Sequence, residues 1–308
     1  MPGSPADEPV ATIFGATGFL GRRIVSRALE RGWHIRAVSR HPDQIRTVLG
    51  TDDRITPLVG DVLDVASVEA ALKGARAAVN AVSLYVEKGA YTFDAVHVKG
   101  AANVAQCAWR LGVARLVHIS GIGADPDSRS AYILARGRGD EAVRSAHPDA
   151  VVLRSAVMFG SDDSLTTTVA GLVRKFPVFP LFGSGSTALQ PVWVGDTAES
   201  VARLLDLRVA AEVPLEVAGP EVMTYRQLVE TIAEAEGVSV HTIPVPFSLW
   251  QALARMGGVI PEIPITRYQI ELMQRPNVAE GRGSRLHDLD IEATSLMGFL
   301  RNRSHVRR

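Results

Sequence analysis

The sequence predicts an α/β fold, a doubly wound parallel sheet with a small, mostly helical C-terminal lobe. Short, nearly all-apolar runs alternate with amphipathic runs through the first half of the chain. This alternation is typical of parallel strands that helices cover on both faces. No solenoid repeat or low-complexity linker divides the chain, so we expect later segments to return to the sheet.

The expected elements follow one another at regular intervals. Strands are predicted at 10–14, 34–38, 55–59, 77–81, 115–119 and 151–153, with helices at 22–31, from 65 onward, and at 91–111 and 132–145. Further on, helices are predicted at 164–174, 196–206 and 224–236, the last capped by Thr224, and strands at 189–194, 213–217 and 240–243. The strand at 189–194 is expected to return to the sheet. Residues 176–185 show little period, and 246–300 supply two or three helices.

A glycine turn joins the first strand to the first helix. Gly15, Gly18 and Gly21 are spaced G-x-x-G-x-x-G. Glycine permits a tight turn and a close backbone approach, and a helix N-terminus attracts pyrophosphate. A strand before the motif and a helix after it favour a Rossmann dinucleotide site over a simple tight turn. The same turn holds the other expected cofactor contacts Thr17, Phe19 and Leu20.

Ser39 and Arg40 stand just beyond the second strand, where an acidic residue would bind the ribose in a site that prefers NAD. A guanidinium can instead hold a phosphate through two parallel hydrogen bonds. We therefore expect NADP(H) to be preferred over NAD(H), with Arg22 as a second contact to the 2′-phosphate. The alternative is that Arg40 is a solvated loop charge.

The ends of the third and fourth strands supply further expected cofactor contacts. An acid at the position of Asp61 can meet the adenine amino group, although Asp61 could equally be a turn or helix-capping residue. Small residues at 80–83 leave room for a ribose to pass over the backbone. The contacts expected at these two strand ends are Asp61, Val62, Ala81 and Val82.

Tyr132 and Arg136 lie four residues apart at the start of a predicted helix and therefore share one face. With the glycine turn, the G-D-V turn at 60–62 and the H-I-S strand end at Ser120, this helix resembles the extended and atypical branches of the short-chain dehydrogenase/reductase superfamily. The resemblance implies that the tyrosine donates or accepts a proton, that a lysine four residues on lowers its pKa and holds the nicotinamide ribose, and that a serine orients the substrate. The expected catalytic residues are Tyr132, Arg136 and Ser120.

Two positions depart from the superfamily pattern. Arg136 replaces the lysine, and an arginine, with its very high pKa, is a poor proton relay. The serine of active extended enzymes usually falls a couple of residues beyond Ser120, where this chain has Gly121 and Ile122. Tyr132 therefore has two readings, a catalytic residue or an aromatic side chain that packs against the cofactor.

A narrower resemblance covers residues 10–300. The segments 98–125, 190–198, 224–237, 264–278 and 286–300 resemble bacterial relatives of the Rossmann-fold accessory subunit of respiratory complex I, many of them called NAD-dependent epimerase/dehydratases. His97 stands where that group would have an asparagine. The resemblance implies a tightly held NADPH and, in the respiratory subunit, a structural task near the quinone end of a membrane complex. Some relatives are linked to ubiquinone biosynthesis.

Two functions follow from these observations. The first is an NAD(P)H-dependent reductase or epimerase that acts on a hydrophobic or quinone-like small molecule. The second is a non-catalytic NADPH-binding protein, a structural or redox-sensing subunit of a respiratory or quinone-biosynthesis complex. The altered pair at Tyr132 and Arg136 favours the second.

Composition limits the partners and the setting. With 33 basic and 33 acidic residues among 308, the chain has no overall field that would favour nucleic acid. Cys107 is the only cysteine, which excludes an internal disulfide, favours a cytoplasmic setting and makes it most simply a small core residue. The histidines are scattered, His118 on an inner strand reads as a hydrogen-bonded core residue, and we expect no metal site.

The domain organisation and any membrane contact follow from the same patterns. We expect a disordered tail at 1–8, a dinucleotide-binding domain at 9–160, returning segments and a substrate or lid lobe at 161–300, and a basic tail at 301–308. No run reaches the roughly 18 to 20 apolar residues that span a bilayer. The apolar stretch 243–265 and the basic tail could rest on the inner face of an anionic membrane, but packing inside the lobe and a solvated tail are favoured.

Overall fold

The computed structural model describes residues 8–206, 214–255, 267–280 and 284–306, which form two compact units. Unit 1 contains the chain up to Ser155 together with 194–216 and 288–291. Unit 2 contains 156–193, 217–287 and 292–308. Of the tail expected at 1–8, residues 1–7 lie outside the described residues.

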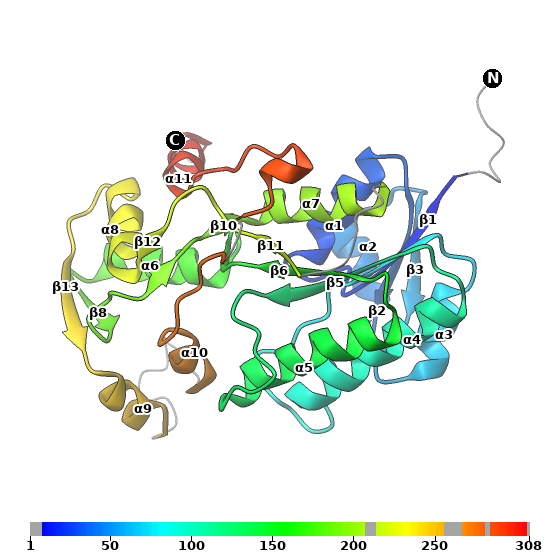
Figure 1. Cartoon of the computed structure of the whole chain (residues 1–308). Coiled ribbons are helices and arrows are strands. Elements are labelled where there is room, and N and C mark those ends of the chain that lie inside the picture. The colour runs from blue at the N-terminus through cyan, green and yellow to red at the C-terminus, as the bar shows by residue number, and fades with distance from the viewer. Residues whose placement is uncertain (1–7, 207–213, 256–266, 281–283, 307–308) are drawn as a thin grey trace. The chain divides into compact units, whose positions relative to one another are not determined.

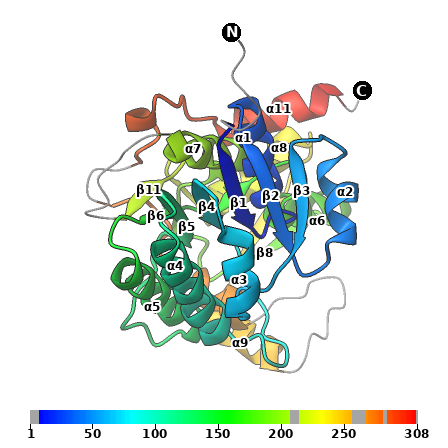
Figure 2. The same cartoon turned by 90° about the vertical axis from the view of Figure 1, so that its right-hand side faces the viewer.

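Unit 1 is built on a seven-stranded sheet with the order β11-β6-β5-β4-β1-β2-β3 (Figures 1 and 2). Strands β1 to β6 pair in parallel. The bounds are β1 Val10–Phe14, β2 His34–Ser39, β3 Ile55–Val59, β4 Ala77–Asn80, β5 Arg115–Gly121, β6 Val151–Ser155 and β11 Leu215–Val217. The chain proceeds from β1 toward β3 on one side and from β4 toward β6 on the other, so β1 and β4 flank the switch point at which such sheets bind ligands.

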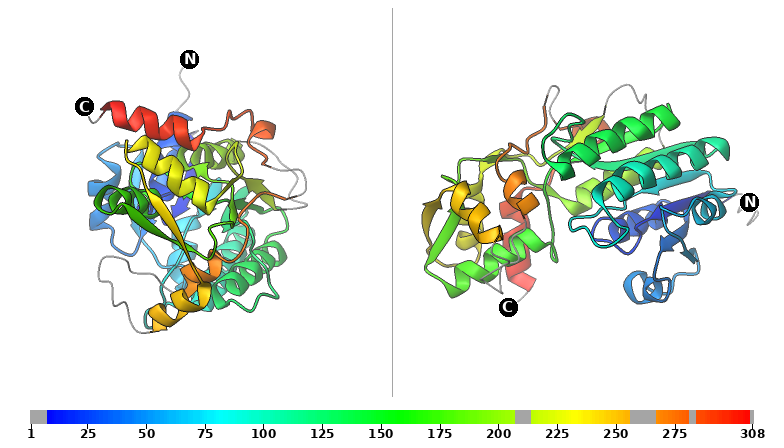
Figure 3. Two further views of the ribbon diagram at one scale, coloured as in Figure 1. Left: turned by 90° about the vertical axis from the view of Figure 1, so that its left-hand side faces the viewer. Right: turned by 90° about the horizontal axis from the view of Figure 1, so that it is seen from below.

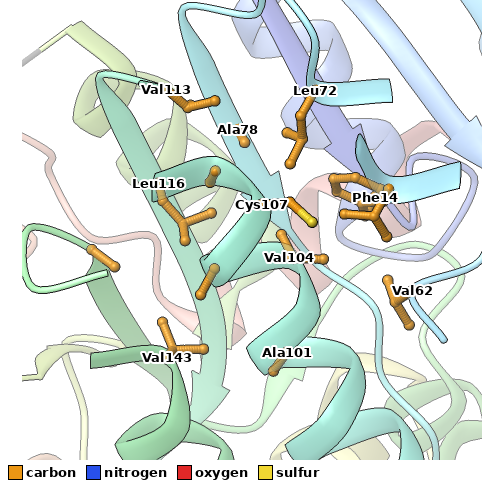
Figure 4. Packing of buried hydrophobic residues seen from close by; sticks show 14 of the residues in the cluster. Phe14, Val62, Leu72, Ala78, Ala101, Val104, Cys107, Val113, Leu116 and Val143 are labelled. Carbon is orange, nitrogen blue, oxygen red and sulfur yellow. The ribbon is translucent and has the colours of Figure 1, made fainter. Parts of the chain in front are cut away.

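Helices cover both faces of this sheet, which confirms the doubly wound fold. Helix α1 packs against α7 on one face, and α4 lies between α3 and α5 on the other (Figures 1 and 3). The bounds are α1 Gly21–Glu30, α2 Asp43–Leu49, α3 Val65–Leu72, α4 Ala101–Arg110, α5 Ala131–Ala146 and α7 Val194–Asp206. A core of small and branched side chains fills the space between α4 and the sheet, and Cys107 lies in it at 1% exposure, as expected (Figure 4).

The long helix expected at 91–111 begins later and in another form. A π-helical segment, η1 Asp94–Gly100, precedes α4. Tyr91 is instead held in a turn with Lys88, because each residue donates its backbone N–H to the carbonyl of the other. The hydroxyl of Thr92 accepts the N–H of Ala95 at 3.0 Å, so a local side-chain bond starts the helix after this turn.

Unit 2 combines helices with three two-stranded sheets, β7-β10, β9-β12 and β8-β13. Figure 3 shows α8 and α11 side by side in this unit. The strands are β7 Met158–Phe159, β8 Val178–Phe182, β9 Ala188–Leu189, β10 Val192–Trp193, β12 Met223–Thr224 and β13 His241–Val245. The helices are α6 Ser164–Lys175, α8 Tyr225–Ala235, α9 Phe247–Arg255, α10 Arg267–Leu272 and α11 Leu296–Val306. A 3-10 turn, η2 His287–Leu289, begins at the last residue of the segment 217–287 of unit 2 and continues into unit 1.

Two expectations for the later segments, those for 189–194 and 176–185, are wrong. The strand expected at 189–194 does not return to the central sheet, because Gln190 and Pro191 split it into β9 and β10, and a proline has no N–H for a strand ladder. The returning strand is β11. Residues 176–185 contain β8, and the basic tail expected from 301 continues helix α11 to Val306. The cap at Thr224 is confirmed as a full capping box with Gln227.

Candidate functional site

The glycine turn is packed so tightly that no side chain fits at Gly15 or Gly21. Gly15 has a φ of +78°, and a Cβ added there would lie 2.9 Å from the carbonyl oxygen of Ala81. A Cβ added to Gly21 would lie only 2.0 Å from the carbonyl oxygen of Gly15. The turn closes with a hydrogen bond of 3.0 Å from the Gly18 N–H to the Gly15 carbonyl. The turn therefore sits directly beside the end of β4, as a dinucleotide cradle requires.

The first turn of α1 carries the other expected contacts of the cradle. No side chain caps this helix at Leu20, which leaves its positive end to an anion. Arg23 is fixed nearby, because its Nη1 donates to the Phe19 carbonyl at 2.6 Å and its guanidinium lies 4.5 Å from the Phe19 ring centroid. Thr17 and Arg22 are half-buried in the same stretch.

The expected adenosine contacts meet around a residue that sequence reasoning missed. The Asp61 carboxylate accepts the Leu63 N–H at 2.9 Å through one oxygen and the Tyr91 hydroxyl at 2.5 Å through the other. The Arg40 guanidinium lies over the Tyr91 ring, 4.4 Å from its centroid. Tyr91 thus joins Arg40 to Asp61. No sequence signal marked it, because the periodic pattern placed Tyr91 in a helix.

The remaining contacts on this side differ in exposure. Ser39 is half-buried at the end of β2, where its Oγ accepts the His41 N–H at 3.1 Å. Val82 is half-buried, and its N–H bonds the Asn80 side chain at 3.3 Å. The Val62 side chain is 4% exposed and lies in the core. Only the backbone of Val62 could therefore contribute to binding.

Tyr132 lies at the start of α5 in an aromatic enclosure. Its hydroxyl accepts a hydrogen bond of 2.8 Å from Arg136 Nη1, and its side chain is 4% exposed. Phe93 and His97 contact the ring edge-on at centroid distances of 5.3 and 5.6 Å, and Tyr85 stacks on it at 5.8 Å. All three come from the segment between β4 and α4, whose aromatic residues were the overlooked signal.

Arg136 occupies the region in which the superfamily pattern places its serine. A Cβ added to Gly121 would lie 3.2 Å from Arg136 Nη2 and 3.3 Å from its Cζ, so the guanidinium lies directly on that glycine. Burial by itself lowers the pKa of Arg136, but the neighbouring Tyr132, Tyr85 and Asp140 raise it, and the net pKa lies above its ordinary value. The side chain therefore stays charged at any physiological pH.

Two of the expected catalytic residues each have a buried polar atom without a partner among the residues that the structure describes. They are Ser120 Oγ and Arg136 Nε. Leaving a buried donor or acceptor unpaired costs about 1–3 kcal/mol, so such atoms mark a position for a ligand or an ordered water. The expected serine at the end of β5 is therefore buried with an unused hydroxyl, and it makes no hydrogen bond to Tyr132.

A row of buried polar side chains lies within electrostatic reach of Arg136. His118 Nδ1 is 3.3 Å from the Asn80 side-chain nitrogen, and His118 Nε2 is 3.9 Å from Asp140. Asp140 accepts the Arg154 Nε–H at 2.8 Å. Burial, with the positive charge of Arg136, lowers the pKa of His118 to about 4 despite the opposing effect of Asp140. A neutral, hydrogen-bonded His118 fits the expected core role.

His97 is likewise neutral at physiological pH. Burial is the main cause that lowers its pKa to about 3, and Arg136 adds to the effect. Its Nε2 lies 3.1 Å from the Leu84 carbonyl oxygen, which fixes the ring against Tyr132. The histidine that replaces the expected asparagine thus still makes a backbone contact at the end of β4.

The described part of the chain contains neither a cluster of metal ligands nor a membrane-spanning helix. No group of three His, Cys, Asp or Glu side chains there could hold a metal ion. None of the helices there combines the length and apolar character that crossing a bilayer demands. In α9, Trp250 donates to the Leu181 carbonyl at 3.0 Å and packs on Phe182, so this aromatic is part of the core of unit 2. Residues 256–266 of the apolar stretch lie outside the described residues.

Comparison with known proteins agrees with this geometry. Residues 15–174, just over half of the chain, match the sequence profile of a family described as NAD(P)H-binding. The chain is 28% identical over 305 residues to the mitochondrial NADH dehydrogenase (ubiquinone) 1 alpha subcomplex subunit 9 of Arabidopsis thaliana, covering 94% of this chain and 76% of that protein. It is 27% identical over 237 residues to a ceramide reductase of Caulobacter vibrioides, covering 77% and 74%.

The same fold occurs in solved structures. The NADPH-dependent quinone oxidoreductase QOR2 of Escherichia coli, complexed with NADPH, superposes with a TM-score of 0.75 at 19% identity, covering 97% of this chain and 100% of that one. At this level of identity the likeness concerns the fold alone.

Proposed function

The chain belongs to the NAD(P)H-binding family, within the extended short-chain dehydrogenase/reductase type, and from this premise we propose that it keeps NADP(H) bound and transfers hydride to a substrate slowly or not at all. When bound, the dinucleotide supplies a hydride and a large, phosphate-rich surface. The residues on this chain determine which of the two is used.

The residues present fit a dinucleotide. The glycine cradle admits backbone only, and the uncapped start of α1 offers a positive end. Ser120 Oγ and Arg136 Nε are buried without a partner among the described residues, as expected of groups that bond a ligand. We assign the pyrophosphate to the cradle of Gly15, Gly18 and Gly21, the 2′-phosphate to Arg40, and the nicotinamide ribose to Tyr132 and Arg136.

The proposal that the nucleotide stays bound without turnover depends on the contacts of Arg136 with Tyr132 and Gly121. Arg136 binds the Tyr132 hydroxyl as a permanent cation, since a guanidinium does not give up its proton in a protein. Its guanidinium also covers Gly121, where a serine side chain would come within 3.2 Å of Arg136 Nη2. The pair therefore holds and orients a ligand but does not resupply a proton to Tyr132.

The test is NADPH oxidation by the purified protein. We expect stoichiometric NADPH binding by calorimetry and no oxidation of the bound nucleotide with quinones or hydrophobic aldehydes above the background rate. Since Arg136 does not resupply Tyr132 with a proton, Tyr132→Phe is expected to leave the rate within about twofold of wild type, whereas losing a general acid costs about 100-fold or more. Turnover that depends on the Tyr132 hydroxyl would contradict the proposal.

That contrary outcome would support a second function, the reduction of a hydrophobic carbonyl compound or a quinone. The enclosure of Tyr132 by Tyr85, Phe93 and His97 favours it, because aromatic walls suit an apolar substrate. The names of the ceramide reductase and of the quinone oxidoreductase point to the same chemical class.

The preference for NADP(H) over NAD(H) is assigned to Arg40. A hydrogen bond to a charged group contributes about 1.5–3 kcal/mol, so Arg40→Asp should change the ratio of NADPH to NADH dissociation constants by at least about tenfold in favour of NADH. Calorimetry with both nucleotides measures the ratio. Arg46→Asp, an exposed arginine on α2, is the control. An unchanged ratio in Arg40→Asp would show that Arg40 is only a solvated charge.

If the nucleotide is bound but not turned over, the protein acts through a partner. The Arabidopsis relative is named as a subunit of NADH dehydrogenase (ubiquinone), and this supports a partner of the same class. We propose that the protein associates from the cytoplasmic side with a respiratory or quinone-handling membrane complex, and that NADPH stabilises the subunit in that assembly.

A further inference from the structure

Tyr91 lies in a turn that the proposed function does not use. The backbone N–H of Lys88 donates to the Tyr91 carbonyl at 3.0 Å, and the N–H of Tyr91 donates to the Lys88 carbonyl at 3.1 Å. Two residues further on, the Phe93 N–H donates to a Glu87 carboxylate oxygen at 2.8 Å. These bonds fix the turn on both sides of Tyr91, so its side chain has a defined direction.

The Tyr91 side chain contacts the two residues that we assign to the adenosine half of the dinucleotide, Arg40 and Asp61. Its hydroxyl donates to Asp61 at 2.5 Å, and its ring lies under the Arg40 guanidinium at 4.4 Å. The second Asp61 oxygen is already engaged with the Leu63 N–H. The oxygen that an adenine amino group would use is therefore the one that holds Tyr91.

The phenol of a tyrosine and the aminopyrimidine half of adenine are similar in size and shape. Each is a planar six-membered aromatic ring with one exocyclic group that donates hydrogen bonds, and each stacks favourably under a guanidinium. The Tyr91 ring lies against the Arg40 guanidinium and its hydroxyl bonds the Asp61 carboxylate. An adenine whose ribose 2′-phosphate is held by Arg40 and whose amino group is held by Asp61 would make the same two contacts.

From this coincidence we infer that Tyr91 occupies the adenine position, so that an adenine dinucleotide binds only by displacing it. The inference rests on the proposed function, since it requires the adenosine half to use Arg40 and Asp61. Tyr91 then determines affinity as a competitor within the chain. The observed dissociation constant is raised by the reciprocal of the fraction of molecules in which Tyr91 has left the position.

Competition by Tyr91 should affect nucleotide affinity in a different way from the phosphate contact of Arg40. Displacing Tyr91 is required equally by NADPH and NADH, because both carry adenine. Removing Tyr91 should therefore lower the dissociation constants for NADPH and NADH by the same factor, whereas a change at Arg40 alters the ratio of the two constants. A ligand without adenine should be indifferent to Tyr91.

The experiment is calorimetric titration of the full chain with NADPH, NADH, adenosine 2′,5′-bisphosphate and reduced nicotinamide mononucleotide. Tyr91→Ala is expected to tighten the binding of the three adenine-containing ligands by about tenfold and to leave the affinity for the mononucleotide unchanged. Tyr91→Phe keeps the ring but loses the bond to Asp61, so it should tighten them by a smaller factor. Val86→Ala, at a residue that is 60% exposed in the same segment, is the control. Melting temperatures establish that each variant is folded.

The possible results separate the two proposals. A wild-type chain that binds neither NADPH nor NADH removes the proposed function and this inference with it. A wild-type chain that binds them, with unchanged or weaker affinities in both Tyr91 variants, overturns this inference alone and makes Tyr91 a support for Arg40. Equal tightening of the mononucleotide would also overturn it, since the effect would then not arise at the adenine position.

Discussion

Replacing Gly21 by alanine is expected to weaken NADPH binding by about 100-fold or more and to lower the melting temperature. The added Cβ would lie 2.0 Å from the Gly15 carbonyl oxygen and 2.8 Å from its carbon. Both contacts are with backbone, so no side chain can rotate away, and the start of α1 must move off the turn. Overpacking of this kind typically costs about 1–3 kcal/mol of stability. Calorimetry and thermal unfolding measure the two effects.

Gly171→Ala is the matched control. Gly171 lies inside α6, and a Cβ added there meets nothing within 4 Å. The same substitution should therefore stabilise that helix by about 0.5–1 kcal/mol and leave NADPH affinity unchanged. A folded Gly21→Ala variant that binds NADPH as tightly as wild type would contradict the assignment of the cradle.

Acidification from about pH 6.5 to about pH 4.5 is expected to lower the free energy of unfolding by about 5 kcal/mol through two histidines. Burial lowers the pKa of His97 to about 3 and that of His118 to about 4, from an ordinary value of 6.5. The unfolded chain therefore takes up protons first as the pH falls. The contribution of the two histidines is complete above about pH 6.5 and decreases by about 1.4 kcal/mol per pH unit for each histidine down to its folded pKa.

Denaturant unfolding across that range measures the slope. His118→Gln should remove about half of the decrease, since one of the two groups no longer titrates. His241→Gln, at an exposed histidine on β13, is the control and should leave the decrease in place. The explanation fails if His118→Gln has the same acid dependence as wild type.

Much of the fold was predictable because its signals are local. The alternating apolar and amphipathic runs placed β1 to β6 and the helices α1, α3 and α5 between them, whereas α2 was not predicted and α4 begins later than expected. The sheet order confirms the doubly wound architecture. The resemblance to the extended short-chain dehydrogenases and to the complex I accessory subunit is confirmed, as is the class of cofactor. Preference for NADP(H), the roles of the site residues and the partner remain proposals.

Other features escaped prediction because short segments carry weak patterns. Residues 189–194 are apolar enough for a strand of the sheet, yet Pro191 divides them, and the shorter β11 takes the place beside β6. The strand β8 was missed because its sequence V-F-P-L-F has no alternation of apolar and polar residues and contains Pro180.

For the site itself, the sequence determined the parts that depend on neighbours along the chain. These are the glycine spacing of the turn, the uncapped start of α1, and the single helix face that Tyr132 shares with Arg136. Only the tertiary structure decided which loops meet at the carboxyl edge of the sheet. It set Tyr91 between Arg40 and Asp61, and it laid Arg136 on Gly121, because such contacts depend on how separate strands align in space and leave no period in the sequence.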